Sequence, residues 1–207
     1  MSPERMGGVG AVLTDEYARA RRIGPDAERV VLVEGASDQA AISTLARRLG
    51  RDLADEGVAL IAIAGATNIG RFLDLLGPSG LQVPLAGLCD RGEAKAFSGA
   101  LRAAGLPVSG PNGMERHGFF TCHDDLEEEL IRALGPETIL HVMERQRQLR
   151  SFHRFQNQPA QRGKTIEAQI WRWLGNHKIR YAPLMVEALD LDRVPPPLER
   201  LLSWIED

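Results

Sequence analysis

The chain has 207 residues, of which 43% are hydrophobic and 26% charged, and its formal net charge is −3. This length and composition suit a globular core domain with an appendage. No apolar run approaches the roughly 20 residues of a membrane-spanning helix, and the slight negative charge argues against a protein that coats nucleic acid by electrostatics alone.

From residue 29 the sequence alternates between short β-branched runs and amphipathic segments. The run Val30–Val33 is typical of a strand buried on both faces, and a helix opened by Ser37 or Asp38 and ended by Gly50 follows it. Strands are predicted at 30–33, 58–63, 83–88, 106–108 and 119–121, and helices at 13–22 (capped by Thr14), 38–49, 69–76 and 94–104.

Beyond residue 125 the pattern is almost entirely helical. Helices are predicted at 126–134, 137–149, 164–174, 183–189 and 197–205. Strand–helix alternation predicts an α/β fold, a Rossmann-like core with a small, mainly parallel sheet and right-handed crossovers. We therefore expect an N-terminal helical extension (1–26), an α/β core (27–125) and a helical C-terminal part packed on the core (126–207).

Three acidic residues lie where strands are predicted to end. Glu34 follows the first strand, Asp38 lies near the start of the next helix, and Asp90 follows the third strand. Ligands of open parallel sheets bind at the carboxyl ends of strands, which are about 4.8 Å apart. Crowded carboxylates repel unless a cation lies between them, and oxygen ligands suit Mg²⁺ or Mn²⁺. Each acid also has a simpler interpretation when taken alone. Asp38 is consistent with a residue that caps its helix, and Glu34 and Asp90 are consistent with solvent-exposed acids in loops.

The same residues resemble the motifs of a known domain. The run Val31–Asp38 resembles the first motif of Toprim domains, Glu-Gly-x-x-Asp, and Leu88-Cys-Asp90 is similar to the start of the second, usually Asp-x-Asp. Gly92 stands where the second Asp is usual, and Glu93 is a candidate replacement.

Further segments resemble the Toprim part of OLD-family nucleases. The turn Gly65–Asn68 is similar to that family's glycine-rich turn, and Phe119–Glu127 resembles its Asp-Leu-Glu segment, which implies metal ligands at Asp125 and Glu127. Gly163-Lys164 resembles the stretch that carries the family's catalytic lysine. Asp125 also fits a helix cap, and Lys164 also fits an exposed helix residue.

The resemblance implies a nuclease that hydrolyses DNA, or RNA, by a two-metal mechanism with Mg²⁺ or Mn²⁺. The expected catalytic residues are Glu34 and Lys164, the lysine neutralising the phosphate. The expected metal ligands are Glu34, Asp38, Asp90, Glu93, Asp125 and Glu127. A basic stretch at 145–180, which also fits a solvated helix face, is expected to contact nucleic acid through Arg154, Arg162, Lys164, Arg172, Lys178 and Arg180.

Two other functions stay open. A non-catalytic module that binds nucleic acid or protein would fit the glycine at position 92, and other Toprim nucleotidyl-transfer chemistry is the second alternative. Strand passage would need Tyr17 or Tyr181, and neither lies in a topoisomerase-like setting. Gly163-Lys-Thr165 ends like a P-loop without its first glycine, so we expect no ATPase here and leave open one supplied in trans.

The cysteines and tryptophans give less information about function. Cys89 and Cys122 make no disulfide framework and no Cys-x-x-Cys zinc motif, and Met1–Arg5 lacks an apolar signal core, so the cytoplasm is the expected location. Most of the three tryptophans are expected in the core, because base stacking would need an exposed ring beside the basic residues.

Overall fold

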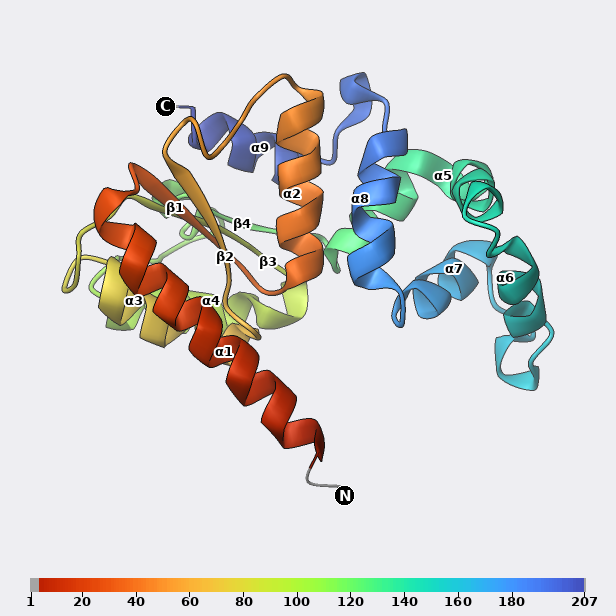
Figure 1. The fold of residues 1–207 in the computed structure, drawn as a ribbon, viewed down its shortest axis with the longest axis horizontal. Coiled ribbons are helices and arrows are strands. Elements are labelled where there is room, and N and C mark those ends of the chain that lie inside the picture. The colour runs from red at the N-terminus through yellow and green to blue at the C-terminus, as the bar shows by residue number, and fades with distance from the viewer. Residues whose placement is uncertain (1–3, 207) are drawn as a thin grey trace.

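The computed structural model describes residues 4–206, the side-chain positions of residues 4–9, 11 and 24 excepted. At its centre is a four-stranded, fully parallel sheet with the strand order β2-β1-β3-β4 (Figure 1). The strands are β1 (Arg29–Val33), β2 (Val58–Ala62), β3 (Leu85–Cys89) and β4 (Phe119–Thr121). The α/β fold predicted from the strand–helix alternation is confirmed.

Helices cover both faces of this sheet. The helices of residues 126–188 form a helical lobe that extends from one of these faces (Figure 1). The helices are α1 (Glu4–Ile23), α2 (Ala36–Arg48), α3 (Ile69–Leu76), α4 (Ala94–Ala103), α5 (Leu126–Arg145), α6 (Leu149–Gln156), α7 (Ile166–Leu174), α8 (Lys178–Ala188) and α9 (Pro196–Trp204). Among the residues described, no helix is both long and apolar enough to cross a membrane.

Strand β1 shows why two cores form. Its side chains alternate between the faces, so Val31 and Val33 join the core that contains α2, α5, α8 and α9. Val30 and Leu32 join the core beneath α1, α3 and α4. All four side chains are fully buried, which explains why the run is continuously apolar.

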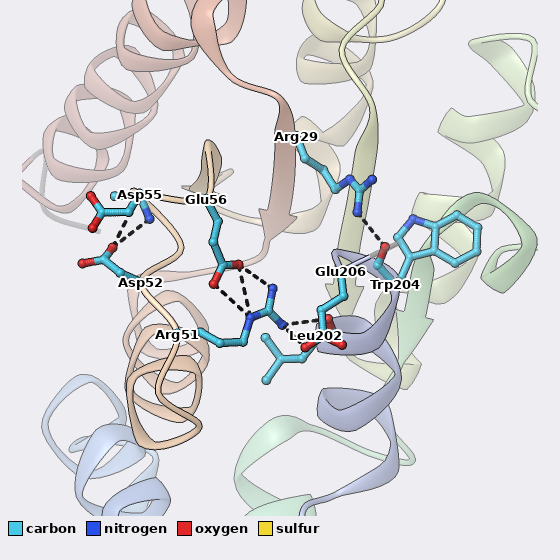
Figure 2. A network of polar contacts seen from close by, with 9 residues as sticks. Arg29, Arg51, Asp52, Asp55, Glu56, Leu202, Trp204 and Glu206 are labelled. Carbon is cyan, nitrogen blue, oxygen red and sulfur yellow. Dashed lines mark hydrogen bonds and ion pairs between the residues drawn. The ribbon is translucent and has the colours of Figure 1, made fainter.

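A polar network fastens α9 to the core at the amino end of the sheet (Figure 2). The Arg51 guanidinium donates to Glu56 at 2.6 Å, to Glu206 at 2.8 Å and to the Leu202 carbonyl at 3.0 Å. Arg29 donates to the carbonyl of Trp204 at 2.7 Å. The C-terminal helix is therefore tied to the loop that precedes β2.

Several local predictions differ from the structure. Thr14 does not cap a helix, because α1 starts earlier and the Thr14 hydroxyl donates to the Gly10 carbonyl inside it. Residues 106–108 form no strand, since Pro107 has no N–H for a ladder. Helix α6 was not predicted separately; it follows a turn in which Arg147 has a φ of 57°.

The predicted gap between helices at 126–134 and 137–149 is present as a break inside α5. Gly135 has non-helical angles there (φ 73°, ψ 159°), and Pro136 follows it. A positive φ is accessible to glycine without strain, and proline fits the first turn of the next helical segment. The two segments of α5 are therefore offset from each other.

Candidate metal centre

The carboxyl ends of β1, β3 and β4 meet at one edge of the sheet, as the sequence predicted for the first and third strands. Glu34 follows β1, Asp90 follows β3, and Asp125 is the N-cap of α5 just after β4. Backbone bonds continue beyond β3 and β4, from Cys122 N–H to the Cys89 carbonyl (2.9 Å) and from Arg91 N–H to the Asp124 carbonyl (2.9 Å). These bonds keep the two acidic loops together.

Glu34 and Asp38 are held by the tight turn between β1 and α2. Helix α2 begins at Ala36 rather than at the predicted Ser37 or Asp38, and Asp38 in its first turn accepts a bond from the Gly35 N–H at 2.9 Å. The Oε2 atom of Glu34 is buried and has no hydrogen-bond partner among the described residues. An unpartnered buried carboxylate oxygen is costly, so this atom points to a ligand.

Asp125 and Glu127 lie at the start of α5 and meet helices α7 and α8. Asp125 caps α5 by accepting from the Glu128 N–H at 2.8 Å, and its other oxygen accepts from the Trp171 indole N–H at 2.7 Å. Glu127 is 3% exposed and forms an ion pair with Lys178 at 2.6 Å. Its Oε1 atom is a second buried carboxylate oxygen that finds no hydrogen-bond partner in the described part of the chain.

An open pocket of about 470 Å³ lies over this edge. Four of the six predicted metal ligands line it together with Arg91 and the ring of Trp171. The four acids are Glu34, Asp90, Glu93 and Asp125. The structure therefore brings the loop after β1 and the loops after β3 and β4 to one shared surface.

Comparison with known proteins identifies the domain to which this acidic edge of the sheet belongs. Residues 27–91 match the family model described as "Overcoming lysogenization defect protein-like, TOPRIM domain". The fold is similar to the C-terminal region of the Xanthomonas campestris pv. campestris OLD protein phased with platinum, with a TM-score of 0.66 and 25% identity over 87% of this chain and 93% of that one. This chain contains an OLD-like Toprim domain. The resemblance found in its motifs is confirmed.

Two further solved structures support the same fold. The mercury-phased structure of that Xanthomonas region has a TM-score of 0.65, 25% identity and coverage of 87% of this chain and 95% of that one. The C-terminal region of the Burkholderia pseudomallei OLD protein has a TM-score of 0.64, 22% identity and coverage of 87% and 98%. No curated protein matches the chain. The fold similarity extends beyond the Toprim match and includes most of the C-terminal helices.

Burial and neighbouring charges both disfavour ionisation of the acids at this edge. Burial of its carboxyl raises the pKa of Asp38 to about 7, and the charges of Glu127 and Glu34 add to the rise. Burial also raises the pKa of Asp90 to about 7, with further contributions from Asp38, Glu34 and Asp125. Burial and then the charge of Glu93 raise the pKa of Glu34. The charges are therefore crowded, as the strand-end positions predicted.

Lys178 places a positive charge against the acids at this edge. It pairs with Glu127 and lies 3.7 Å from Asp125, and its charge lowers the pKa of Glu34, Asp38 and Asp90. Burial alone would lower the pKa of Lys178, but the hydrogen bond to Glu127 and the surrounding negative charges raise it. Lys178 is thus a charged ammonium that partly offsets the acid cluster.

The donor set suits a hard divalent cation in its chemistry. It consists of carboxylate oxygens. Two of these, on Glu34 and Glu127, are buried and have no hydrogen-bond partner among residues 4–206. Within residues 4–206, however, no three His, Cys, Asp or Glu side chains converge in a geometry that could hold a metal ion. The acids are gathered at one edge, but as placed they do not form a closed ligand shell.

The remaining predicted residues lie on the helical lobe. Lys164 precedes α7 and is half-buried, and its side chain forms no ion pair with any described residue. The predicted arginine contacts, Arg154, Arg162, Arg172 and Arg180, are all exposed. Sequence reasoning placed Lys178 with these surface residues and did not find its contact with Glu127. No local motif marks that contact, because it depends on how α8 packs against α5.

Proposed function

We propose that this Toprim domain is a nuclease that hydrolyses phosphodiester bonds of DNA with Mg²⁺ or Mn²⁺ held at its acidic pocket. The observation that carries the proposal is the buried, unpartnered Oε2 atom of Glu34 at a sheet edge to which Asp90, Glu93 and Asp125 also come. Such an oxygen is stabilised by a cation, and phosphodiester hydrolysis is a reaction that bound divalent cations accelerate.

The acids divide into two groups by their elements. Glu34 and Asp90, with Asp38, would hold one cation between β1 and β3, and Asp125 and Glu127, with Glu93, would hold a second beside α5. When bound, such ions supply positive charge that favours ionisation of the attacking water and stabilises the leaving oxygen. The Asp125 cap and the Gly35–Asp38 bond fix two of these side chains before any ligand arrives.

We assign the neutralisation of the transition-state phosphate to Lys178 in place of Lys164. The Lys178 ammonium lies within 3.7 Å of the Glu127 and Asp125 carboxylates, and Asp125 lines the pocket, so a phosphate bound there would lie near this charge. Its role needs charge and no proton transfer. Lys164 keeps the second role predicted for it, contact with the nucleic-acid backbone.

The helical lobe supplies the surface for nucleic acid. Its exposed arginines on α6, α7 and the loop between them form no ion pair with any residue in the described part of the chain, so their charges are free for phosphates. They are Arg150, Arg154, Arg162 and Arg172. Binding through such contacts is indifferent to sequence and weakens with salt.

A plasmid-nicking assay tests the proposal. With Mg²⁺ or Mn²⁺ the purified protein is expected to convert supercoiled DNA to the open-circular form, and Glu34→Ala to abolish the conversion. Glu137→Ala, an exposed acid on α5, is the matched control and is expected to nick normally. Equal nicking by the protein and Glu34→Ala, or none by either, would refute the assignment.

A non-catalytic binding module is the second candidate, and the lack of three converging donors in residues 4–206 favours it. It differs from the nuclease in its response to Mn²⁺. Isothermal titration that detects Mn²⁺ binding, lost in Glu34→Ala, supports the nuclease. Titration without heat of binding, together with retained DNA binding, would support the module.

A further inference from the structure

Helix α7 carries two tryptophans with opposite surroundings. Trp173 is 4% exposed and stacks on His177 with ring centroids 4.0 Å apart. Trp171 is 45% exposed and has no aromatic or cationic ring partner among the described residues. Residues two apart on a helix face different sides, so the burial of Ile170, Trp173 and Leu174 in the core turns Trp171 outward.

The exposed Trp171 side chain lies at the acidic pocket. Its ring lines the same pocket as Glu34, Asp90, Glu93 and Asp125. Its indole N–H donates to Asp125 at 2.7 Å, which fixes one edge of the ring toward the acids and leaves much of the ring accessible to solvent. A large aromatic ring left exposed gives up the favourable burial that Trp173 has, so its position at the pocket calls for a ligand.

We propose that Trp171 is a stacking platform for an unpaired nucleobase next to the phosphate that the site cleaves. Every base has an aromatic face, so a tryptophan ring binds any of them, and a base within a duplex has both faces already occupied. The exposed Arg172 on the same helix and Arg91 at the pocket rim supply charge for the flanking phosphates. The substrate class that follows is single-stranded or locally unpaired DNA.

This inference rests on the proposed function, because it places the base beside the same acidic pocket. It also differs from a purely structural role for Trp171. If the ring served only to orient Asp125, the indole N–H would matter and the aromatic face would not. Trp171→Phe removes the N–H and keeps a face for stacking, whereas Trp171→Ala removes both.

The test measures binding without cleavage. Fluorescein-labelled oligothymidylate and an abasic oligonucleotide of equal length and charge are titrated by anisotropy at low salt in EDTA. The full chain is expected to bind the thymidylate about tenfold more tightly than the abasic strand. Trp171→Phe is expected to keep most of this preference and Trp171→Ala to lose it. Ile179→Ala, at an exposed apolar residue on α8, is the control and is expected to keep it in full.

Two results would overturn the inference: equal affinity of the unmodified protein for both strands, or an undiminished preference in Trp171→Ala. The first comparison needs no variant and so does not depend on how a variant folds. A preference for thymidylate in a protein that fails to nick DNA would sustain the stacking site and refute the nuclease. Nicking without any preference would do the reverse.

Discussion

Replacing Asp90 by asparagine is expected to stabilise the metal-free protein at neutral pH. The Asp90 side chain forms no hydrogen bond with any described residue that asparagine would break. Burial of its carboxyl disfavours the charged form most, and the neighbouring carboxylates repel that charge as well. The rise of its pKa from 3.8 to about 7 corresponds to about 4 kcal/mol at roughly 1.36 kcal/mol per pH unit. Asp90 is partly exposed, so solvent reduces both the cost of burying its charge and the repulsion, and we expect about 1–2 kcal/mol.

The direction of the pH dependence follows from proton binding. Between about pH 4 and pH 7 the folded protein holds a proton on Asp90 that the unfolded chain has released. The stability of the unmodified protein therefore falls as the pH rises through this window. Asp90→Asn lacks the part of this loss that comes from Asp90, so its advantage grows from near zero at pH 4 and is constant above pH 7.

Thermal unfolding in EDTA measures this difference. At pH 8 the melting temperature of Asp90→Asn is expected to exceed that of the unmodified protein by about 2–6 °C. Asp74→Asn, at an exposed position on α3, serves as the control and is expected to change little. A melting temperature at pH 8 equal to or below that of the unmodified protein would refute the idea that burial and the neighbouring acids make the Asp90 charge unfavourable.

Three further predictions concern separate parts of the molecule. In a single-turnover assay, Lys178→Met is expected to reduce the nicking rate roughly a hundredfold and Lys164→Met less than tenfold, because Lys178 contacts the acids. The reverse order would assign neutralisation of the transition-state phosphate to Lys164. Gly92→Asp is expected to fold, because a Cβ at this position meets no atom within 4 Å. Calorimetry is expected to show that it binds Mn²⁺ about tenfold more tightly than the unmodified protein. Weaker binding would contradict the idea that a carboxylate at position 92 contributes to the metal site. Arg51→Met is expected to lower the free energy of unfolding, measured in urea, by about 2 kcal/mol, because Arg51 is nearly buried between Glu56, Glu206 and the Leu202 carbonyl. The control, Arg102→Met at an exposed position, is expected to change it little. Equal effects of the two substitutions would mean that the network in Figure 2 does not contribute to stability.

The sequence predicted what depends on neighbours along the chain. The run Val30–Val33 indicated a buried strand, and the ends of that strand and of β3 placed Glu34 and Asp90 at one edge because parallel strands share a direction. The Asp125 cap was readable for the same reason, since a cap is a contact between residues three apart. These features require no knowledge of how the helices pack.

What the sequence did not predict depends on packing between distant segments. Lys178 meets Glu127 across 51 positions, and the Trp171 indole meets Asp125 across 46, so neither contact leaves a local pattern. Both depend on α7 and α8 lying against the start of α5. The sequence could suggest that an exposed tryptophan would be informative, but only the fold shows which of the three is exposed.

The central claim is that the acids at the carboxyl edge of the sheet bind a divalent cation. Anomalous diffraction from crystals soaked in Mn²⁺ tests it most directly. The expected result is an anomalous peak in contact with the carboxylates of Glu34 and Asp90, absent from crystals of Glu34→Ala. Soaked crystals without a peak at this edge, with the Glu34 Oε2 atom still unpartnered, would contradict the claim.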